Sequence, residues 1–98
     1  MEITKILEGN SLTFVLDGRL DTVTAPELEA QFMASESDAE ELIFDFAKLD
    51  YISSAGLRVL LAAQKVMHKK GSMVIKNANE TIMEVFEVTG FIDILTIE

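Results

Sequence analysis

Two adjacent serines, followed by a glycine and an arginine, are the residues whose types and spacing could carry chemistry in this chain. Ser53 and Ser54 come just before a stretch with helical periodicity, and the first N–H groups of a helix lack internal partners. A phosphate there would bring about −1.5 to −2 charges to the positive end of the helix dipole, which tolerates an anion. Arg58 lies four residues beyond Ser54 on the same helical face and could pair with it. Serines at this place are ordinary helix caps, and a phosphate added to one of them would be tolerated by the fold.

The two serines differ in their expected roles. Ser53 comes earlier and better suits a cap or loop position, so we favour Ser54 as the acceptor and keep Ser53 as the alternative. Gly56 costs about 1 kcal/mol of helix propensity relative to alanine, which indicates a close approach of another backbone. A partner docked over this helix end would have to bury the new charge at a cost of several kcal/mol. Since about 1.4 kcal/mol is tenfold in affinity, one phosphate would abolish a complex of micromolar affinity.

Catalysis by these serines is not indicated. A serine nucleophile needs a nearby base, but the only histidine, His68, lies about 20 Å further along the helix at 1.5 Å per residue. The chain has no cysteine, and its histidine and scattered carboxylates do not have the spacing of metal ligands. No glycine-rich phosphate-binding loop is present. We therefore expect a protein that is not an enzyme and has neither a cofactor nor a metal site.

Composition narrows the class of protein further. The chain has 98 residues, 49% of them hydrophobic, which suits one domain over residues 1–98. A net charge of −9 repels nucleic acids and anionic lipid surfaces, and no membrane span or secretory signal is evident, so we expect a cytoplasmic location. Residues 51–79 contain five lysines and arginines and no acidic residue. That segment is equally compatible with a solvated helix face and with a docking surface.

The N-terminal half predicts two strands, a helix and a third strand. Residues 3–8 and 12–17 are β-rich runs separated by Gly9-Asn10, which favours a hairpin. A capping box formed by Thr24 and Glu27, with Pro26 in the first turn, predicts a helix to about residue 35. Residues 42–46 are mostly apolar, as in a central strand covered on both faces.

The C-terminal half predicts two helices and two strands. A helix over residues 54–70 ends at Gly71, which we expect in the left-handed conformation. A strand at 73–76 leads to a helix with an Asn77–Glu80 capping box, ended by Gly90, and to a last strand at 94–97. In the first of these helices, one face contains Leu57, Leu60, Leu61, Gln64 and Met67, and the other contains Arg58, Ala62, Lys65 and Lys69. The core face of the second comprises Ile82, Val85, Phe86 and Thr89.

The element order β-β-α-β-α-β-α-β predicts an α/β fold with a mixed sheet of four to five strands. The segment Asp50-Tyr51-Ile52-Ser53-Ser54-Ala55-Gly56-Leu57-Arg58 resembles the signature of STAS domains, the sulfate transporter and anti-sigma factor antagonist family. Gly18-Arg19-Leu20-Asp21 followed by Thr24-Ala25 resembles the second landmark of that family. The likeness covers essentially the whole chain and implies the STAS fold.

The resemblance also implies a function. In antagonists of this family the serine one residue before the small residue and the glycine is the phosphoacceptor, which corresponds to Ser54. The implied partners are an anti-sigma factor that is itself a serine kinase, and a metal-dependent serine phosphatase. Asp21 would lie beside Ser54, either in contact with a partner or as a turn or cap residue. The residues expected to bind the partner are Asp21, Thr22, Ser53, Gly56, Leu57, Arg58, Ala62 and Lys65, with Leu57 and Arg58 included because we expect them to be exposed.

One departure keeps a second function open. Many phosphorylated antagonists have aspartate immediately before the acceptor and serine or threonine after it, whereas this chain has Ser53 and Ala55. The alternative is a STAS module that is never phosphorylated and serves as an adaptor subunit of a signalling or lipid-transport complex. For a switch whose main face must stay free, the simplest expectation is a monomer.

Overall fold

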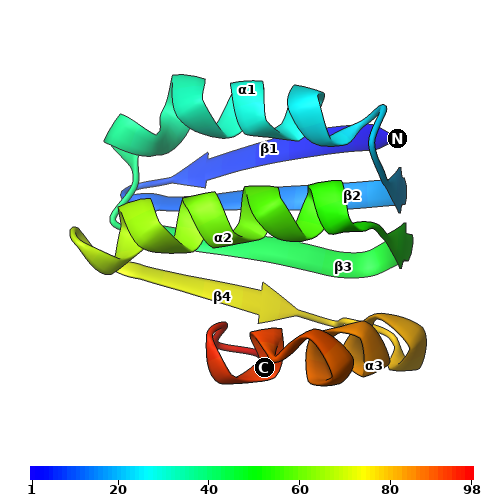
Figure 1. Ribbon diagram of the computed structural model, residues 1–98. Helices are drawn as coiled ribbons and strands as arrows, with labels where there is room; N and C mark the ends of the chain where they lie inside the picture. Colours follow the sequence, from blue (N-terminus) through cyan, green and yellow to red (C-terminus); the bar gives the residue numbers. More distant parts are fainter.

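The computed structural model describes residues 1–98 apart from the side chain of Asp38, and it forms one four-stranded sheet with helices packed against it (Figure 1). The sheet order is β1-β2-β3-β4, with β1 antiparallel to β2 and the other neighbours parallel. Its strands are β1 (Glu2–Glu8), β2 (Ser11–Leu20), β3 (Glu41–Ile52) and β4 (Ser72–Lys76). The α-helices are α1 (Ala25–Ser35), α2 (Ser54–His68) and α3 (Glu80–Thr89), and the short 3-10 helices are η1 (Glu36–Asp38) and η2 (Phe91–Asp93). The predicted mixed sheet and its hairpin are confirmed.

The two long helices lie on the same face of the sheet (Figure 1). The crossovers β2–α1–β3 and β3–α2–β4 advance in one direction along the sheet, and right-handed crossovers of this kind place both helices on one side. Leu12, Phe14 and Phe44 are fully buried on the covered face, where the two phenyl rings stack 5.8 Å apart. Val15 and Ile43, which alternate with them, are only partly buried. The prediction that strand 42–46 is covered on both faces is therefore wrong.

Two predicted capping boxes are also wrong. The Thr24 side chain makes no capping bond to α1, because its oxygen accepts the Asp21 N–H at 2.9 Å while its hydroxyl donates to the Arg19 carbonyl at 2.8 Å. Asn79, not Asn77, caps α3, and its side-chain oxygen accepts from the Ile82 N–H at 2.9 Å. Asn77 has a left-handed backbone with φ 63° and donates to the Asp45 carboxylate. In both places a long-range or turn contact occupies the side chain that local sequence assigned to a helix end.

The predicted last strand at residues 94–97 is absent from the part of the chain that the structure describes. After the left-handed Gly90 the chain forms η2, and only Ile97 pairs with the sheet, through one parallel bridge to Ile75. The side chain of Leu95 is buried, so this segment packs against the core more than it extends the sheet. On α3, Ile82 and Phe86 are buried as predicted, Val85 is partly buried, and Thr89 is exposed against expectation.

Gly71 is required for a reason other than the predicted left-handed turn. Its φ is not positive, but a Cβ atom there would lie 1.7 Å from the Glu40 carbonyl oxygen. The same oxygen accepts the Ser72 N–H at 3.0 Å. The start of β4 is therefore packed directly on the residue that precedes β3, and only a residue without a side chain fits.

Replacing Gly71 by alanine should strongly destabilise the fold, because the obstacle is backbone and cannot rotate away. We expect a loss of about 3 kcal/mol or more in the free energy of unfolding, at or beyond the upper end of overpacking effects, measured by urea denaturation. Gly9→Asn is the matched control, since Gly9 has a left-handed φ of 61° and a Cβ atom there would meet nothing within 4 Å, and asparagine tolerates that conformation. Equal stability of Gly71→Ala and wild type would contradict the packing.

Candidate functional site

The start of α2 is attached to the ends of two parallel strands. Ser53, the N-cap residue, is extended, and its N–H donates to the Leu20 carbonyl at the end of β2 at 2.9 Å. Its carbonyl accepts the Leu57 N–H at 3.0 Å and so begins the helix. Ser54 is the first helical residue and is exposed. The predicted beginning of the helix at Ser54 is confirmed.

The two serines have opposite environments. Ser53 is only partly exposed as a residue, and its hydroxyl oxygen is buried with no hydrogen-bond partner among the described atoms. It occupies the cap position that the sequence favoured for it, but its side chain makes no capping bond. Ser54 faces solvent on the first turn. Of the two residues, Ser54 is the one that an enzyme can reach without opening the structure.

Gly56 and Leu57 are buried beneath this helix end. A Cβ atom on Gly56 would lie 2.8 Å from side-chain atoms of both Ile52 and Leu20. The helix end is closely packed at Gly56, but the neighbours are side chains, so the predicted approach of another backbone is wrong. Leu57 is only 6% exposed, so the expectation that it is available to a partner is wrong. The helical face that buries it also contains Val59, which the sequence analysis did not place in the core.

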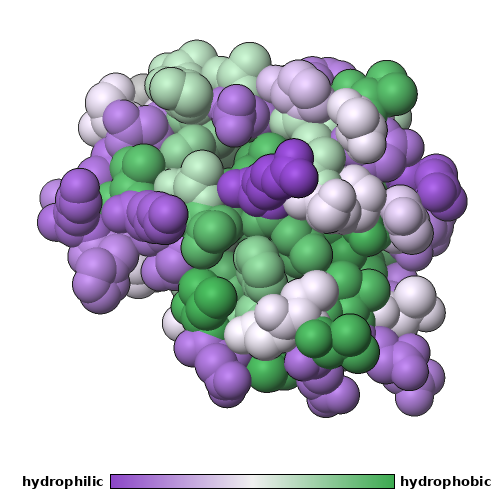
Figure 2. Space-filling view, viewed as in Figure 1, coloured by the Kyte–Doolittle hydropathy of each residue, from purple (hydrophilic) through white to green (hydrophobic). Residues whose placement is uncertain are grey.

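A shallow groove of about 270 Å³ separates the first turns of α1 and α2. We call it the helix-end groove, and it is lined by Thr22, Ala25, Pro26, Glu29, Ala55, Arg58 and Val59. Figure 2 shows the helix-covered face, where apolar side chains gather in the middle with polar ones around them. Arg58 is exposed and has no ion-pair partner among the described side chains. The groove therefore combines small apolar surfaces with one unpaired cation.

The remaining residues of the predicted partner-binding set are distributed more widely. Ala62 and Lys65 are exposed on later turns of α2 and do not line the helix-end groove. Lys65 belongs to a different hollow, near the end of α2, together with His68. Lys70 of the basic segment forms an ion pair with Glu36 at 2.8 Å. The structure thus brings Thr22 and Arg58 together near Ser54 and places Ala62 and Lys65 further away.

Asp21 organises the loop between β2 and α1. Its carboxylate accepts the N–H groups of Val23 at 3.0 Å and Thr24 at 3.1 Å, and Arg19 lies 3.9 Å away. The hydrogen bond from the Thr24 N–H is the main reason that the pKa of Asp21 is below its ordinary value of 3.8, and the Val23 N–H also lowers it. Asp21 is therefore ionised at neutral pH, and the turn role that the sequence left open is present.

The sequence analysis missed Val23, which this turn leaves 84% exposed. It also missed Pro26, Glu29, Ala55 and Val59 as lining residues of the groove. Val23 lies between Asp21 and Thr24 of the second family landmark, so the landmark could have drawn attention to it. The groove residues could not be found in this way, because they come from two helices whose packing angle the sequence does not state.

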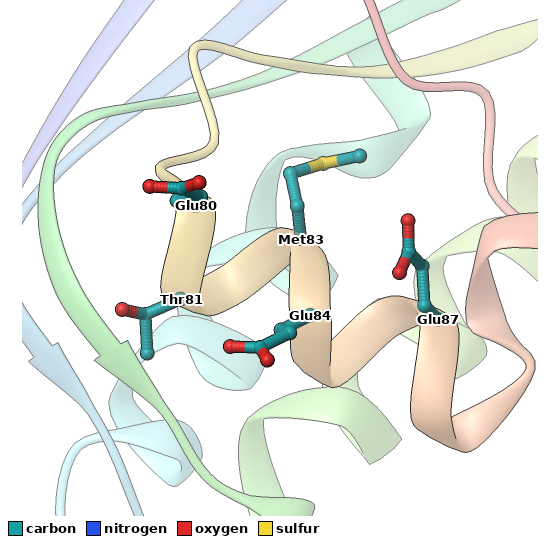
Figure 3. Close-up of a pocket in the computed structure, with 5 residues that line it drawn as sticks. All are labelled: Glu80, Thr81, Met83, Glu84 and Glu87. Atoms are coloured by element: carbon teal, nitrogen blue, oxygen red, sulfur yellow. The ribbon is translucent and has the colours of Figure 1, made fainter.

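Other hollows offer no catalytic arrangement. One of about 360 Å³ is lined by Glu80, Thr81, Met83, Glu84 and Glu87. Figure 3 shows that all five side chains come from α3.

No group of three histidine, cysteine or acidic residues among the described residues could hold a metal ion. His68 is the last residue of α2, about 20 Å from Ser54 at the helical rise. Within the described chain, no helix is long and apolar enough to cross a membrane.

The model of the STAS domain family matches residues 3–98 of this chain. The chain belongs to the STAS domain family. This STAS domain is 35% identical over 99 residues to BtrV of Bordetella bronchiseptica, described as a candidate anti-sigma factor antagonist, with 99% of this chain and 85% of the relative covered. It is 27% identical over 89 residues to the anti-sigma-B factor antagonist of Bacillus subtilis, with 90% and 82% covered.

Solved structures of SpoIIAA have the same fold as this STAS domain. The unphosphorylated form of that anti-sigma factor antagonist superposes with a TM-score of 0.79 at 16% identity, covering 99% of this chain and 87% of SpoIIAA. The phosphorylated form of the Bacillus protein gives 0.78 at 17% identity, covering 99% and 91%. The predicted STAS fold is therefore confirmed, with a sheet of four strands.

The Asp21 turn should respond to acid at an unusually low pH. Because its folded pKa is lowered, the turn is complete above the ordinary value and is lost as the pH falls through the lowered one. We expect the amide protons of Val23 and Thr24 to titrate by NMR with a midpoint below 3.8. Asp21→Asn should abolish this step, which assigns it to the carboxylate. A midpoint at or above 3.8 would contradict the hydrogen-bonded turn.

Proposed function

We propose that this chain is an anti-sigma factor antagonist switched by phosphorylation of Ser54. Unmodified and monomeric in the cytoplasm, it binds an anti-sigma factor that is a serine kinase, and the sigma factor is released. Phosphorylation of Ser54 by that kinase ends the binding, and a metal-dependent serine phosphatase reverses the modification. The names of the relatives support the antagonist class. The switch is supported by SpoIIAA, whose structure has been solved in both the phosphorylated and the unphosphorylated form.

One observation carries the proposal: Ser54 is exposed on the first turn of α2, while the Ser53 hydroxyl is buried. A kinase must bring its active site to within bonding distance of the acceptor oxygen, which favours Ser54. The start of α2 is held by the Ser53–Leu20 hydrogen bond and by the packing of Gly56. The acceptor is therefore presented on a fixed backbone and not on a free loop.

The same geometry explains how the protein tolerates the phosphate. The first turn of α2 contains no acidic side chain among the described residues, and its N–H groups favour a nearby anion. Arg58 lies four residues further on the same helix and has no competing ion-pair partner among the described side chains. A phosphate on Ser54 can therefore be compensated within the chain, and the fold is retained.

For the partner, binding over a phosphorylated Ser54 is unfavourable. The helix-end groove lies beside Ser54 on the face that we assign to the complex, with Thr22 and Arg58 among its lining residues. Once a partner covers this surface, the phosphate loses its water, and several kcal/mol of desolvation must be offset by new contacts. Gly56 and Leu57 are buried, so they do not contact the partner, and their packing holds the start of α2 in place. The switch therefore acts on binding and leaves folding unchanged.

A fixed adaptor is the second candidate function. It is favoured by Ser53, which stands where many phosphorylated antagonists have aspartate. In this reading the helix-end groove binds a permanent partner in a signalling or lipid-transport complex, and Ser54 is never modified. The two functions differ in one observable, the covalent state of Ser54 after exposure to the kinase.

Incubation with ATP and the anti-sigma factor kinase that binds this chain should add one phosphate, about 80 Da by mass spectrometry. Ser53→Ala is the matched control and should still be phosphorylated, because its hydroxyl is buried in the wild type. Ser54→Ala should show no adduct. Phosphate on Ser53, or no adduct in the wild type, would contradict the proposal, and the second result would favour the adaptor.

Ser54→Asp should weaken binding to the same anti-sigma factor at least tenfold in calorimetry, a difference of about 1.4 kcal/mol. The reason is the desolvation of a charge at the contact surface, so Ser54→Ala, which adds no charge, should keep wild-type affinity. Both variants should melt within a few degrees of the wild type, since the site is exposed. Full affinity of Ser54→Asp would remove the electrostatic mechanism.

A further inference from the structure

We propose that Val23 is a preformed apolar anchor that inserts into a pocket of the anti-sigma factor when the unphosphorylated protein binds it. This inference rests on the proposed function and adds a second contact to it. Val23 is 84% exposed in the loop between β2 and α1. Turn positions usually hold glycine, asparagine, aspartate, serine or proline for conformational reasons. A branched apolar side chain at this place has no such use within the chain.

The loop holds Val23 in a fixed position. The Asp21 carboxylate accepts the Val23 N–H at 3.0 Å and the N–H of Thr24 at 3.1 Å. The Thr24 side-chain oxygen accepts the Asp21 N–H at 2.9 Å, and its hydroxyl donates to the Arg19 carbonyl at 2.8 Å. The Ala25 N–H donates to the Asp21 carbonyl at 2.8 Å. These bonds on both sides of Val23 mean that binding costs little further ordering of the backbone.

The side chain adds to this preorganisation. Valine is branched at Cβ and has few rotamers, so little side-chain entropy is lost when it is immobilised. Contacts that need no ordering contribute more of their gross energy to affinity. Val23 meets these conditions before any partner is present.

Val23 belongs to the same surface as the proposed acceptor. Its neighbour Thr22 lines the helix-end groove together with Ala55, which directly follows Ser54. The loop leaves β2 at Leu20, whose carbonyl accepts the N–H of Ser53. Figure 1 shows the loop and the start of α2 at the same end of the sheet. A partner that covers Ser54 and the helix-end groove therefore lies next to the loop that presents Val23.

The surroundings specify the complementary pocket. Asp21 is ionised at the base of the turn, Glu27 is exposed in the first turn of α1, and Glu29 lines the groove. The whole chain carries a net charge of −9. The matching feature of the anti-sigma factor is an apolar depression with lysine or arginine on the side that faces α1. Since the Val23 contact is uncharged, its contribution should change little with salt concentration.

The experiment compares Val23→Ser with Val88→Ser, using as the probe the anti-sigma factor kinase of the phosphorylation experiment. Val88 is 86% exposed on α3 and outside the groove, so it is a control of equal chemistry and exposure. We expect Val23→Ser to weaken binding of the unphosphorylated protein about tenfold or more, and Val88→Ser to leave it within twofold. Because both positions are exposed, thermal melting should be unchanged in both variants.

A kinetic readout distinguishes an anchor from a residue that acts on the phosphoryl transfer itself. Loss of a contact made equally in the ground and transition states raises KM and leaves kcat unchanged. We therefore expect phosphorylation of Val23→Ser to show a KM about tenfold higher at wild-type kcat. A fall in kcat at constant KM, or equal losses of affinity in Val23→Ser and Val88→Ser, would overturn the inference.

The two proposals fail in different ways. Wild-type affinity in Val23→Ser together with loss of binding in Ser54→Asp would overturn the anchor and leave the switch intact. Absence of any complex between the wild type and the kinase would overturn both proposals. Tenfold weakening in Val23→Ser with full affinity in Ser54→Asp would support the anchor and remove the electrostatic switch.

Discussion

The hydrogen bond from the Ser53 N–H to the Leu20 carbonyl is the interaction on which the functional end of this STAS domain depends. It joins the end of β2 to the residue that begins α2, and Gly56 completes the junction by admitting Leu20 and Ile52 against the helix. The β2–α1 loop and the α2 start are thereby parts of one rigid body. Because backbone groups make this bond, it does not change when a side chain at the surface is modified.

The two adjacent serines have different roles at this junction. The Ser53 backbone makes the hydrogen bonds of the junction, and its hydroxyl is buried. The Ser54 side chain makes no contact that a phosphate on it would break. Modification at a structural position usually couples a signal to unfolding. Here the hydroxyl that we propose as the acceptor and the groups that support the junction belong to different residues, so phosphorylation of Ser54 would cost little folding free energy.

Much of the fold and part of the site could be predicted from the sequence, and the failures have physical causes. The signature around Ser54 and the Gly9-Asn10 turn are local, and both were located correctly. The predicted cap at Thr24 is wrong because hydrogen bonds within the turn occupy its side chain, and the predicted cap at Asn77 is wrong because its side chain bonds to Asp45, which is distant in sequence. Leu57 was misjudged because one helical turn cannot show which face the sheet covers. The predicted strand at 94–97 is wrong because its apolar residues are buried without pairing to the sheet. The groove could not be predicted because it depends on how two helices pack.

The parallel pairing of β2, β3 and β4 has a consequence for the order of folding. Only the hairpin of β1 and β2 is local in sequence, whereas Ser11 of β2 and its neighbour Glu41 of β3 are 30 residues apart. Each later strand can join only after a whole helix-containing crossover has been closed, and non-local contacts of this kind slow folding. The junction that presents Ser54 is completed by such a closure, so a nascent chain offers no correctly shaped acceptor until β3 has joined the sheet.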